Sequence, residues 1–412
     1  MAEASRDYDR VMQLSRRRLL LSAASVPAIL NARNKASELD AVLRVGRERH
    51  AVPAVVAAVA NAKTITYSGA FGTRDSASGK PVQADSIFAV ASMTKAVTSA
   101  AAMQLVEQGK LSLHDPIGKH LPEFSTLHVL DGVEPSSGRP KLRPSTKTVT
   151  LRHLLTHTSG FVYDNWNQEL ARFYASTPQR PAVPPLAFEP GDRWEYGTSI
   201  DWVGRIVETV SGMTLEAYFQ KFILQPLGMK DTSYILNAEA FQRKVSTWRR
   251  QPDGRLKEDP YVMPQPAKSF NGGGGLYSTA PDYVRFMQMF LNKGVSASGE
   301  RILQERSIAA MSANQVGSLA AGRLQSARAE VSSEVDFHPG ATDKFTYGFL
   351  MNPQAYSKGR SAGSLAWAGI QNTFYWIDLK KSLCAVVMMQ FYPFCDKEAM
   401  GLLREFEQAV YA

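Results

Sequence analysis

Apolar residues along the chain follow two different spacings. Runs of strand length, rich in β-branched and aromatic residues, lie near both ends and predict two strands at 52–60 and 64–71 and two more at 365–378 and 383–390. Apolar residues spaced three and four apart predict helices at 37–49, 92–108, 201–211, 215–222, 282–292 and 396–411. Strands at both ends with helices between them predict an α/β (α+β) fold, in which one antiparallel sheet is flanked by helices.

This pattern also predicts how the chain divides into domains. We expect residues 37–90 and 264–412 to form the sheet domain, residues 91–263 to form an inserted, mostly helical domain, and the active site to lie in the cleft between them. Residues 129–149 are rich in Pro, Ser, Gly and Lys and predict a surface excursion. Residues 313–345 show no strong period and predict a long, loop-rich insertion.

Composition excludes several classes of protein. The 412 residues are 44% hydrophobic and 21% charged, as in ordinary globular proteins, and two cysteines cannot form a disulfide framework. A run of about 18 apolar residues, as a membrane-spanning helix requires, does not occur in the sequence. The net charge of +9 raises the alternative of a nucleic-acid binder, but no basic run or basic-aromatic interleaving supports it, so we expect a solvated basic surface.

Much of the basic excess lies in residues 1–36, which we interpret as a tail outside the fold. Three arginines, Arg16 to Arg18, directly precede an uncharged stretch from residue 19 to 32. This order is typical of a twin-arginine export signal, which predicts a periplasmic or secreted protein. The alternative is a basic tail joined to the first helix of a cytoplasmic protein.

The most specific chemistry lies at the start of the helix predicted at 92–108. Ser92 and Lys95 are three residues apart, so they share a helix face and the lysine amine can reach the serine hydroxyl. A serine is a weak nucleophile until a base takes its proton, and a desolvated lysine can act as that base. The surrounding helix is rich in alanine and poor in charge, so a lysine within it indicates a functional role.

Two later segments could complete such a site. Tyr196 lies in a Gly-rich turn and could exchange a proton with the serine, although a lone tyrosine is more often a core residue. The segment Trp367, Ala368, Gly369 and Ile370 lies on a predicted strand, where small residues allow a substrate to approach the backbone. The alternative for this segment is a core strand with one aromatic residue.

The order of these segments resembles the serine β-lactamase and penicillin-binding-protein superfamily. Segments similar to its class C branch connect them, at 109–116, 154–160, 225–229 and 272–279. Residues 161–167 and the Trp-x-Gly strand are most similar to family VIII carboxylesterases. The resemblance extends from about residue 40 to the end of the chain.

The resemblance implies roles for individual residues. Ser92 would be the acylated nucleophile, Lys95 and Tyr196 its base system, and the backbone N–H groups of Ser92 and Ile370 the oxyanion hole. Trp367 stands where true β-lactamases have a lysine that binds the substrate carboxylate, which favours esters over penicillins. The remaining substrate-binding positions that the resemblance implies are Tyr163, Ala368, Gly369 and Thr198.

Two departures from the family pattern affect these expectations. The family's Tyr-x-Asn is Tyr196-Gly197-Thr198 here, so the usual amide contact of the Asn would have to come from Thr198 or Ser199. Ala368 replaces a glycine and is expected to narrow the acyl pocket slightly.

We therefore predict a carboxylesterase that hydrolyses short-chain esters through an acyl-Ser92 intermediate, with weak β-lactam hydrolysis as a side activity. A β-lactamase, D-amino-acid peptidase or transesterase of the same fold and a non-enzymatic penicillin-binding-like sensor are the alternatives. The expected partner is a small-molecule ester, with no nucleic acid and no stable membrane insertion. No cofactor or metal is implied, because His153 and His157 lack the glutamate of a His-Glu-x-x-His zinc motif.

Overall fold

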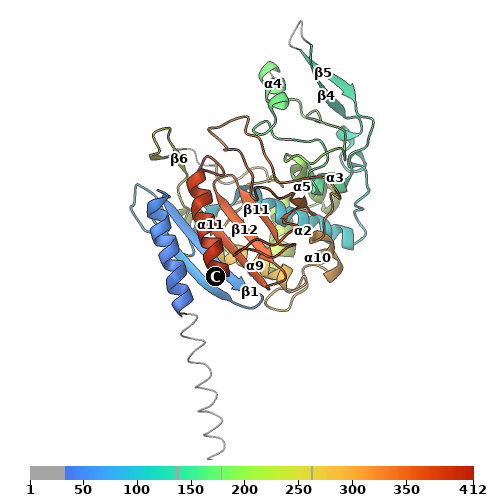
Figure 1. Cartoon of the computed structure of the whole chain (residues 1–412). Helices are drawn as coiled ribbons and strands as arrows, with labels where there is room; N and C mark the ends of the chain where they lie inside the picture. The colour runs from blue at the N-terminus through green and yellow to red at the C-terminus, as the bar shows by residue number, and fades with distance from the viewer. Residues whose placement is uncertain (1–32, 135–138, 178, 261–262) are drawn as a thin grey trace, which may run out of the picture.

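The two ends of the chain meet in one antiparallel sheet. The computed structural model describes residues 33–412 except 135–138, 178 and 261–262 (Figure 1). Within these residues the largest sheet has the strand order β2-β1-β13-β12-β11-β10-β9. Its strands are β1 (Ala54–Asn61), β2 (Ile65–Gly72), β9 (Lys344–Phe345), β10 (Leu350–Met351), β11 (Leu365–Gly369), β12 (Thr373–Asp378) and β13 (Leu383–Met388). The predicted α/β architecture with an antiparallel sheet flanked by helices is confirmed.

Helices cover both faces of this sheet. The helix over 33–49 and α11 (Lys397–Tyr411) lie side by side on one face, where the ring of Phe406 packs against Tyr67 of β2 and Trp376 of β12 (Figure 1). On the other face α9 (Ala280–Leu291) packs against β1, β12 and β13. The apolar alternation of the strands and the apolar stripes of these helices therefore produce a three-layered core.

The helix that begins near Ser92 is central to the molecule. It consists of the 3-10 turn η1 (Ala91–Met93) followed by α2 (Thr94–Glu107). Residues 94–105 of α2 are all buried, as its alanine-rich composition predicts, and α2 packs against α5 (Ser199–Ser211). Such a helix is a rigid support for the side chains at its start.

The middle of the chain combines short helices with short strands. The helices are α3 (Leu151–Leu155), α4 (Gln168–Ser176), α6 (Leu215–Phe219), α7 (Gln225–Leu227), α8 (Ala238–Gln242) and, after the glycine run, α10 (Glu305–Met311), with the turns η2 (Ile117–Lys119), η3 (Pro122–Phe124) and η4 (Gln220–Leu224). The strands form three small sheets: β4 (His128–Val133) with β5 (Pro140–Pro144), β3 (Phe88–Ala89) with β8 (Tyr277–Ser278), and β6 (Trp248–Arg250) between β7 (Leu256–Glu258) and β14 (Phe391–Tyr392).

The structure differs from the sequence-based expectations at three places. The helix predicted from residue 37 already begins at 33. The single strand predicted at 365–378 is two strands, β11 and β12, joined by a turn in which Asn372 has a φ of +62°. The surface excursion predicted at 129–149 contains the β4–β5 hairpin, whose strands pair from His128↔Pro144 to Val133↔Pro140 and which projects from the body of the molecule (Figure 1).

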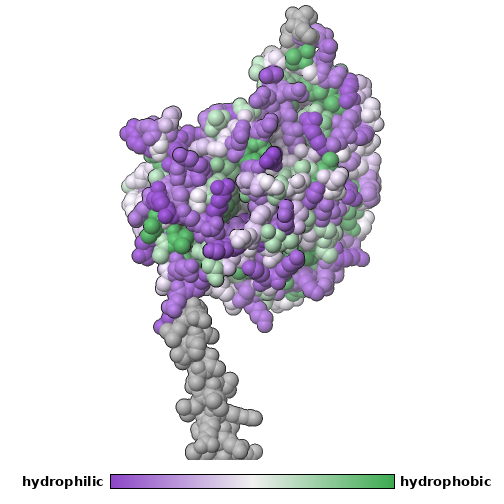
Figure 2. All heavy atoms as spheres, in the orientation of Figure 1, coloured by the Kyte–Doolittle hydropathy of each residue, from purple (hydrophilic) through white to green (hydrophobic). Residues whose placement is uncertain are grey.

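The surface and the ends of the chain do not narrow the class of protein further. The face in Figure 2 is mostly hydrophilic, with a hollow beside α11 in which apolar side chains are visible. None of the helices among the described residues is long and apolar enough to cross a membrane. The predicted export signal falls in residues 1–32, which lie outside the described residues.

Candidate active site

Ser92 lies at an unusual point of the backbone. β3 ends at Ala89, and Ala91 adopts a φ of +44°, in the left-handed region that alanine rarely occupies. The chain then enters η1, which holds Ser92, and continues into α2. Strain of this kind persists only where the surrounding structure enforces it, and it is common at functional sites. No sequence signal predicts this strain, because Ala91 is an ordinary residue type for a strand-to-helix connection.

Lys95 connects Ser92 to the rest of the site. Its side chain is 1% exposed, and Nζ lies 3.2 Å from Ser92 Oγ, 3.2 Å from the Tyr163 hydroxyl and 2.6 Å from the carbonyl oxygen of Gly273. The carbonyl can only accept a hydrogen bond, whereas the two hydroxyls can donate or accept. The same geometry therefore accommodates an ammonium that donates three hydrogen bonds and a neutral amine that accepts the proton of Ser92.

The glycine run at 272–275 closes the site from the other side. Its carbonyl groups accept hydrogen bonds from α2: Thr98 Oγ1 donates to Gly272 at 2.6 Å and Lys95 to Gly273. A methyl group on Gly273 would lie 1.6 Å from Asp201 Oδ1 and 3.1 Å from Lys95 Nζ. Close backbone packing of this run therefore brings a backbone acceptor to Lys95.

Two tyrosines approach Lys95 together. Gly197 makes this possible, because a methyl group there would lie 2.1 Å from the carbonyl oxygen of Phe161, and the N–H of Tyr163 donates to the carbonyl of Tyr196 at 3.4 Å. Lys95 Nζ lies 5.3 Å from the ring centroid of Tyr163 and 5.0 Å from that of Tyr196. Both rings thus border the ammonium, and the site is enclosed by aromatic residues.

The roles of the two hydroxyls differ from the sequence-based expectation. Tyr163, expected only to bind substrate, donates to or accepts from Lys95, whereas the Tyr196 hydroxyl accepts from Trp367 Nε1 at 3.3 Å. Burial, with further contributions from Asp201 and Tyr196, raises the pKa of Tyr163 well above its ordinary value, so Tyr163 is a neutral phenol. Trp367 supplies a donor that can stabilise negative charge developing on the Tyr196 oxygen.

The end of β11 lies against the turn that holds Ser92. A methyl group on Gly369 would be 2.5 Å from the carbonyl oxygen of Val90, two residues before the serine. β10 pairs only with Leu365 and Ala366, so the edge from Trp367 to Gly369 is not paired by that strand. Among the described residues, the backbone amides of Ser92 and Ile370 donate to no backbone carbonyl. Both amides, expected as oxyanion donors, are therefore available.

Two expected substrate contacts are placed differently. Side chains alternate along a strand, so the Ala368 methyl lies on the opposite face of β11 from Trp367, and only its backbone can border a substrate beside Tyr196. Ser199 is fully buried and its hydroxyl bonds to that of Ser159 at 2.8 Å, so it cannot replace the family's Asn. Thr198 lines a groove with Trp202 and Asn271 and remains available.

Sequence reasoning missed two titratable groups at the site. Asp201, in the first turn of α5, is half-buried, with its Oδ1 atom shielded from solvent. Burial raises its pKa to about 6, against the opposing effect of the nearby Lys95 charge. His157 is fully buried, 4.9 Å from the Tyr196 ring, and burial followed by the Lys95 charge lowers its pKa well below the ordinary value, so it is neutral. The one available signal for Asp201 was an acid five residues after Tyr196, in the first turn of the next helix.

Comparison with known proteins agrees with this geometry. The profile of the Beta-lactamase family matches residues 39–406. The chain belongs to the Beta-lactamase family. Esterase EstB of Burkholderia gladioli is 32% identical over 378 residues, which cover 87% of this chain and 91% of EstB. The resemblance to the β-lactamase superfamily that the sequence indicates is therefore confirmed.

Other members of the family catalyse acyl transfer. Monacolin J acid methylbutanoyltransferase of Aspergillus terreus is 28% identical over 95% of this chain and 97% of its own length. The structure of simvastatin synthase from the same organism superposes with a TM-score of 0.80 at 27% identity, over 92% of this chain and 98% of the synthase. An uncharacterized protein of Mycobacterium tuberculosis is 39% identical over 58% of this chain, and the alignment covers 62% of that protein's length. The chain is thus a member of a family of hydrolases and acyltransferases that share this fold.

Proposed function

We propose that this protein is a carboxylesterase that forms an acyl-enzyme on Ser92. The observation that supports it most is the contact of the buried Lys95 Nζ with Ser92 Oγ at 3.2 Å. An amine held beside the serine can take its proton as Oγ attacks an ester carbonyl. The N–H groups of Ser92 and Ile370 would stabilise the oxyanion that forms.

The alcohol must then leave with a proton, and water must attack the acyl-enzyme. We assign the return of the proton to Lys95 and Tyr196 together, because Lys95 Nζ contacts Ser92 Oγ and lies 5.0 Å from the ring centroid of Tyr196. Trp367 bonds to Tyr196 through Nε1 at the position where the resemblance implies a lysine in true β-lactamases. An indole supplies no charge for a penicillin carboxylate, which favours an uncharged ester.

The hydrolysis of p-nitrophenyl butyrate and of a chromogenic cephalosporin tests this proposal. We expect the wild type to turn over the ester far faster than the cephalosporin, and Ser92→Ala to lose at least about a thousandfold in kcat. Ser361→Ala, in a Gly-x-Ser-x-Gly sequence that lies outside the site, is the control and should keep full activity. An active Ser92→Ala variant, or equal turnover of both substrates, would overturn the assignment; no turnover and no reaction with an acylating probe would favour a non-enzymatic sensor.

Acyl transfer to an alcohol is the second candidate, favoured by the similarity to a methylbutanoyltransferase over 95% of the chain. An alcohol would replace water in the attack on the acyl-enzyme, with Ser92 again as the leaving group. Adding 1-butanol to the hydrolysis assay and measuring butyl butyrate by gas chromatography separates the two. Ester formation that exceeds acid formation at millimolar alcohol would identify an acyltransferase.

We also propose that residues 1–32 direct export of the folded enzyme through the twin-arginine pathway, on the strength of the three arginines before an uncharged stretch. Fractionation of cells that express the full chain and an Arg16→Lys/Arg17→Lys/Arg18→Lys variant tests this. Loss of the exported form in the variant is expected; equal cytoplasmic retention of both forms would contradict it.

A further inference from the structure

The turn between β11 and β12 holds one of the two proposed oxyanion donors, the N–H of Ile370. The turn consists of residues 370–372 and lies between Gly369 and Thr373, which pair with each other. Its last residue, Asn372, has a φ of +62°, as the last residue of a three-residue hairpin loop commonly does. Asparagine adopts this left-handed conformation more readily than most residues, so the residue type suits the backbone here.

One hydrogen bond in this turn fixes the direction of the Ile370 amide. The N–H of Asn372 donates to the carbonyl oxygen of Gly369 at 3.0 Å. That carbonyl and the N–H of Ile370 belong to the same planar, trans peptide group, so they point in opposite directions. Because the carbonyl points into the turn, the N–H points out of it, toward the edge of β11 that β10 leaves unpaired.

The side chain of Asn372 holds this turn in place. It is 0% exposed, and Nδ2 donates to the carbonyl oxygens of Phe391 and Pro393, at 2.8 Å each. Its Oδ1 accepts a hydrogen bond from the N–H of Cys395 at 2.9 Å. All three partners lie in one segment that follows β13. The buried amide therefore joins the turn to a second part of the chain, and both of its polar atoms have partners.

The same segment contacts the backbone that leads to Ser92. The side chain of Gln390 is 1% exposed, and its Oε1 accepts a hydrogen bond from the N–H of Ala89 at 3.1 Å. Ala89 lies three residues before Ser92, whose own N–H is the other proposed donor. Residues 390–395 therefore hold both backbone segments that would supply an oxyanion donor.

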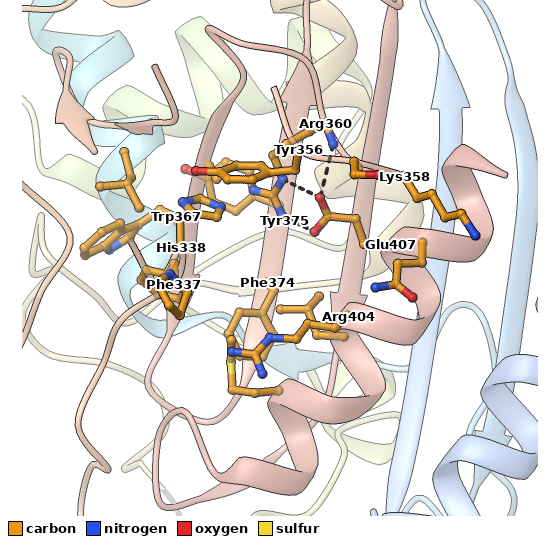
Figure 3. A pocket seen from close by; sticks show the side chains of 18 residues that line it. Phe337, His338, Tyr356, Lys358, Arg360, Trp367, Phe374, Tyr375, Arg404 and Glu407 are labelled. Carbon is orange, nitrogen blue, oxygen red and sulfur yellow. Dashed lines mark hydrogen bonds and ion pairs between the residues drawn. The ribbon is translucent and has the colours of Figure 1, made fainter. Parts of the chain in front are cut away.

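The strands on either side of the turn are fixed by other contacts. Phe374 and Tyr375 of β12 pair with β11, and both strands border a cavity beside α11 (Figure 3). There the buried Arg360 donates to Glu407 of α11 at 2.6 Å, so these two charges neutralise each other (Figure 3). None of the described residues 370–372 lines this cavity. The turn therefore depends on its own hydrogen bonds rather than on this packing.

We propose that Asn372 is a positioning residue of the oxyanion hole, which holds the Gly369–Ile370 peptide so that its N–H faces the acyl group on Ser92. This inference rests on the proposed function, since the donor acts only when negative charge develops on an ester carbonyl there. A donor that is already in place needs no reorganisation as the charge forms. If the peptide rotated, its carbonyl would face the oxyanion and repel it.

Steady-state kinetics of Asn372→Gly with p-nitrophenyl butyrate test the inference. Glycine adopts the left-handed conformation readily, so this variant removes only the side-chain hydrogen bonds. We expect kcat to fall by roughly ten- to a hundredfold while KM changes by less than about threefold. Because both hydrolysis and acyl transfer begin with acylation of Ser92, the test applies to either reaction.

Inhibition by butylboronic acid provides a readout that a purely structural role would not change. Oγ of Ser92 adds to boron as the serine proton passes to Lys95, and an oxygen of the tetrahedral adduct takes the place of the oxyanion. In Asn372→Gly the inhibition constant should rise by the factor by which kcat/KM falls, because both require the same donor. A residue that only stabilises the fold would lower the Tm and leave this constant unchanged.

Asn352 supplies the matched control at the other end of β11. It is 1% exposed, and its Nδ2 donates to the carbonyl oxygens of Gln354 and Ser361 at 2.8 and 2.9 Å. Asn352 thus holds a loop that precedes β11, as Asn372 holds the turn that follows it. Asn352→Ala should lower the Tm as Asn372→Gly does and change kcat by less than about twofold.

Asn372→Asp replaces the glycine variant if circular dichroism shows that the latter does not fold. It keeps the oxygen that accepts from Cys395, and burial favours the protonated acid, which donates one hydrogen bond, so kcat should fall by roughly three- to tenfold. An unchanged kcat or boronate inhibition constant in a folded Asn372 variant, or an equal loss of kcat in Asn352→Ala, would overturn the inference alone. A wild type that does not hydrolyse the ester would overturn the proposed function and the inference together.

Discussion

Replacing Asp201 by asparagine removes a half-buried negative charge and keeps the shape of the side chain. Asp201 lies in α5 against the glycine run, on the same face of Gly273 as Lys95 Nζ. Burial raises its pKa from 3.8 to about 6, even though Lys95 opposes the shift. The folded protein therefore binds a proton at Asp201 more tightly than the unfolded chain does.

The sign and size of the effect on stability follow from this difference. Asp201 favours the folded state below pH 3.8, where it is protonated in both states, and this advantage is lost as the pH rises through about 6. At about 1.4 kcal/mol for each pKa unit, a shift of about two units costs the wild type about 3 kcal/mol above pH 6. Asp201→Asn should therefore be more stable than the wild type by up to about 3 kcal/mol at pH 8, and the difference should shrink toward pH 4.

Urea unfolding of both proteins at several pH values between 4 and 8 measures this difference. Asp253→Asn is the control: Asp253 is exposed and its hydrogen bond with Arg255 lowers its pKa, so that variant should change with pH in the opposite direction. The activity of Asp201→Asn should fall by roughly tenfold or more, because Lys95 loses the charge that faces it. Parallel stability curves for wild type and Asp201→Asn would refute the assignment of a charged, half-buried Asp201.

Three further predictions concern the neighbours of Lys95. Gly197→Ala should lower the free energy of unfolding by about 3 kcal/mol or more, because its methyl would overlap a backbone carbonyl; an unchanged Tm would contradict this. Trp367→Phe removes the hydrogen-bond donor to the Tyr196 hydroxyl. Steady-state kinetics should show kcat lowered by roughly tenfold and a smaller change in KM. An effect on KM alone would mean that the indole only binds substrate. Tyr163→Phe removes one of three partners of Lys95 and should lower kcat less than Tyr196→Phe does; the reverse order would make Tyr163 the proton carrier.

The parts of the site that depend on local sequence were predictable. Ser92 and Lys95 are three residues apart on a helix that its own composition predicts to be buried, and the structure brings the two side chains together at 3.2 Å. The strand that holds Trp367 was predicted from its aromatic and β-branched residues. In each case spacing within one element determines the geometry.

The parts that depend on tertiary packing were not predictable. The carbonyl of Gly273 contacts Lys95 from 178 residues away, and no pattern in either segment indicates that pairing. The sequence predicts Tyr196 as the partner of Lys95 and Tyr163 only as a substrate contact. The hydrogen bond of Tyr163 with Lys95 depends on Gly197, which lets the two tyrosine segments pack together. Asp201 was missed because its burial depends on the glycine run that packs over it.

The same distinction explains the differences in the fold. The strand predicted at 365–378 is interrupted at Asn372, whose left-handed backbone conformation makes a turn. The apolar residues on both sides of Asn372 form one continuous run, so the sequence pattern does not indicate this turn. The β4–β5 hairpin lies in a segment rich in turn-forming residues, which predicts a loop. Its strands form because they pair with each other, and composition alone does not indicate that pairing.

The central claim is that Ser92 carries an acyl group during turnover. Mixing the enzyme with p-nitrophenyl butyrate, quenching with acid within milliseconds and analysing peptides by mass spectrometry tests it directly. A butyryl group on the peptide that contains Ser92, formed and lost at rates that match turnover, is the predicted result. A butyryl group on another residue, or rapid turnover without any acylated peptide, would contradict the account.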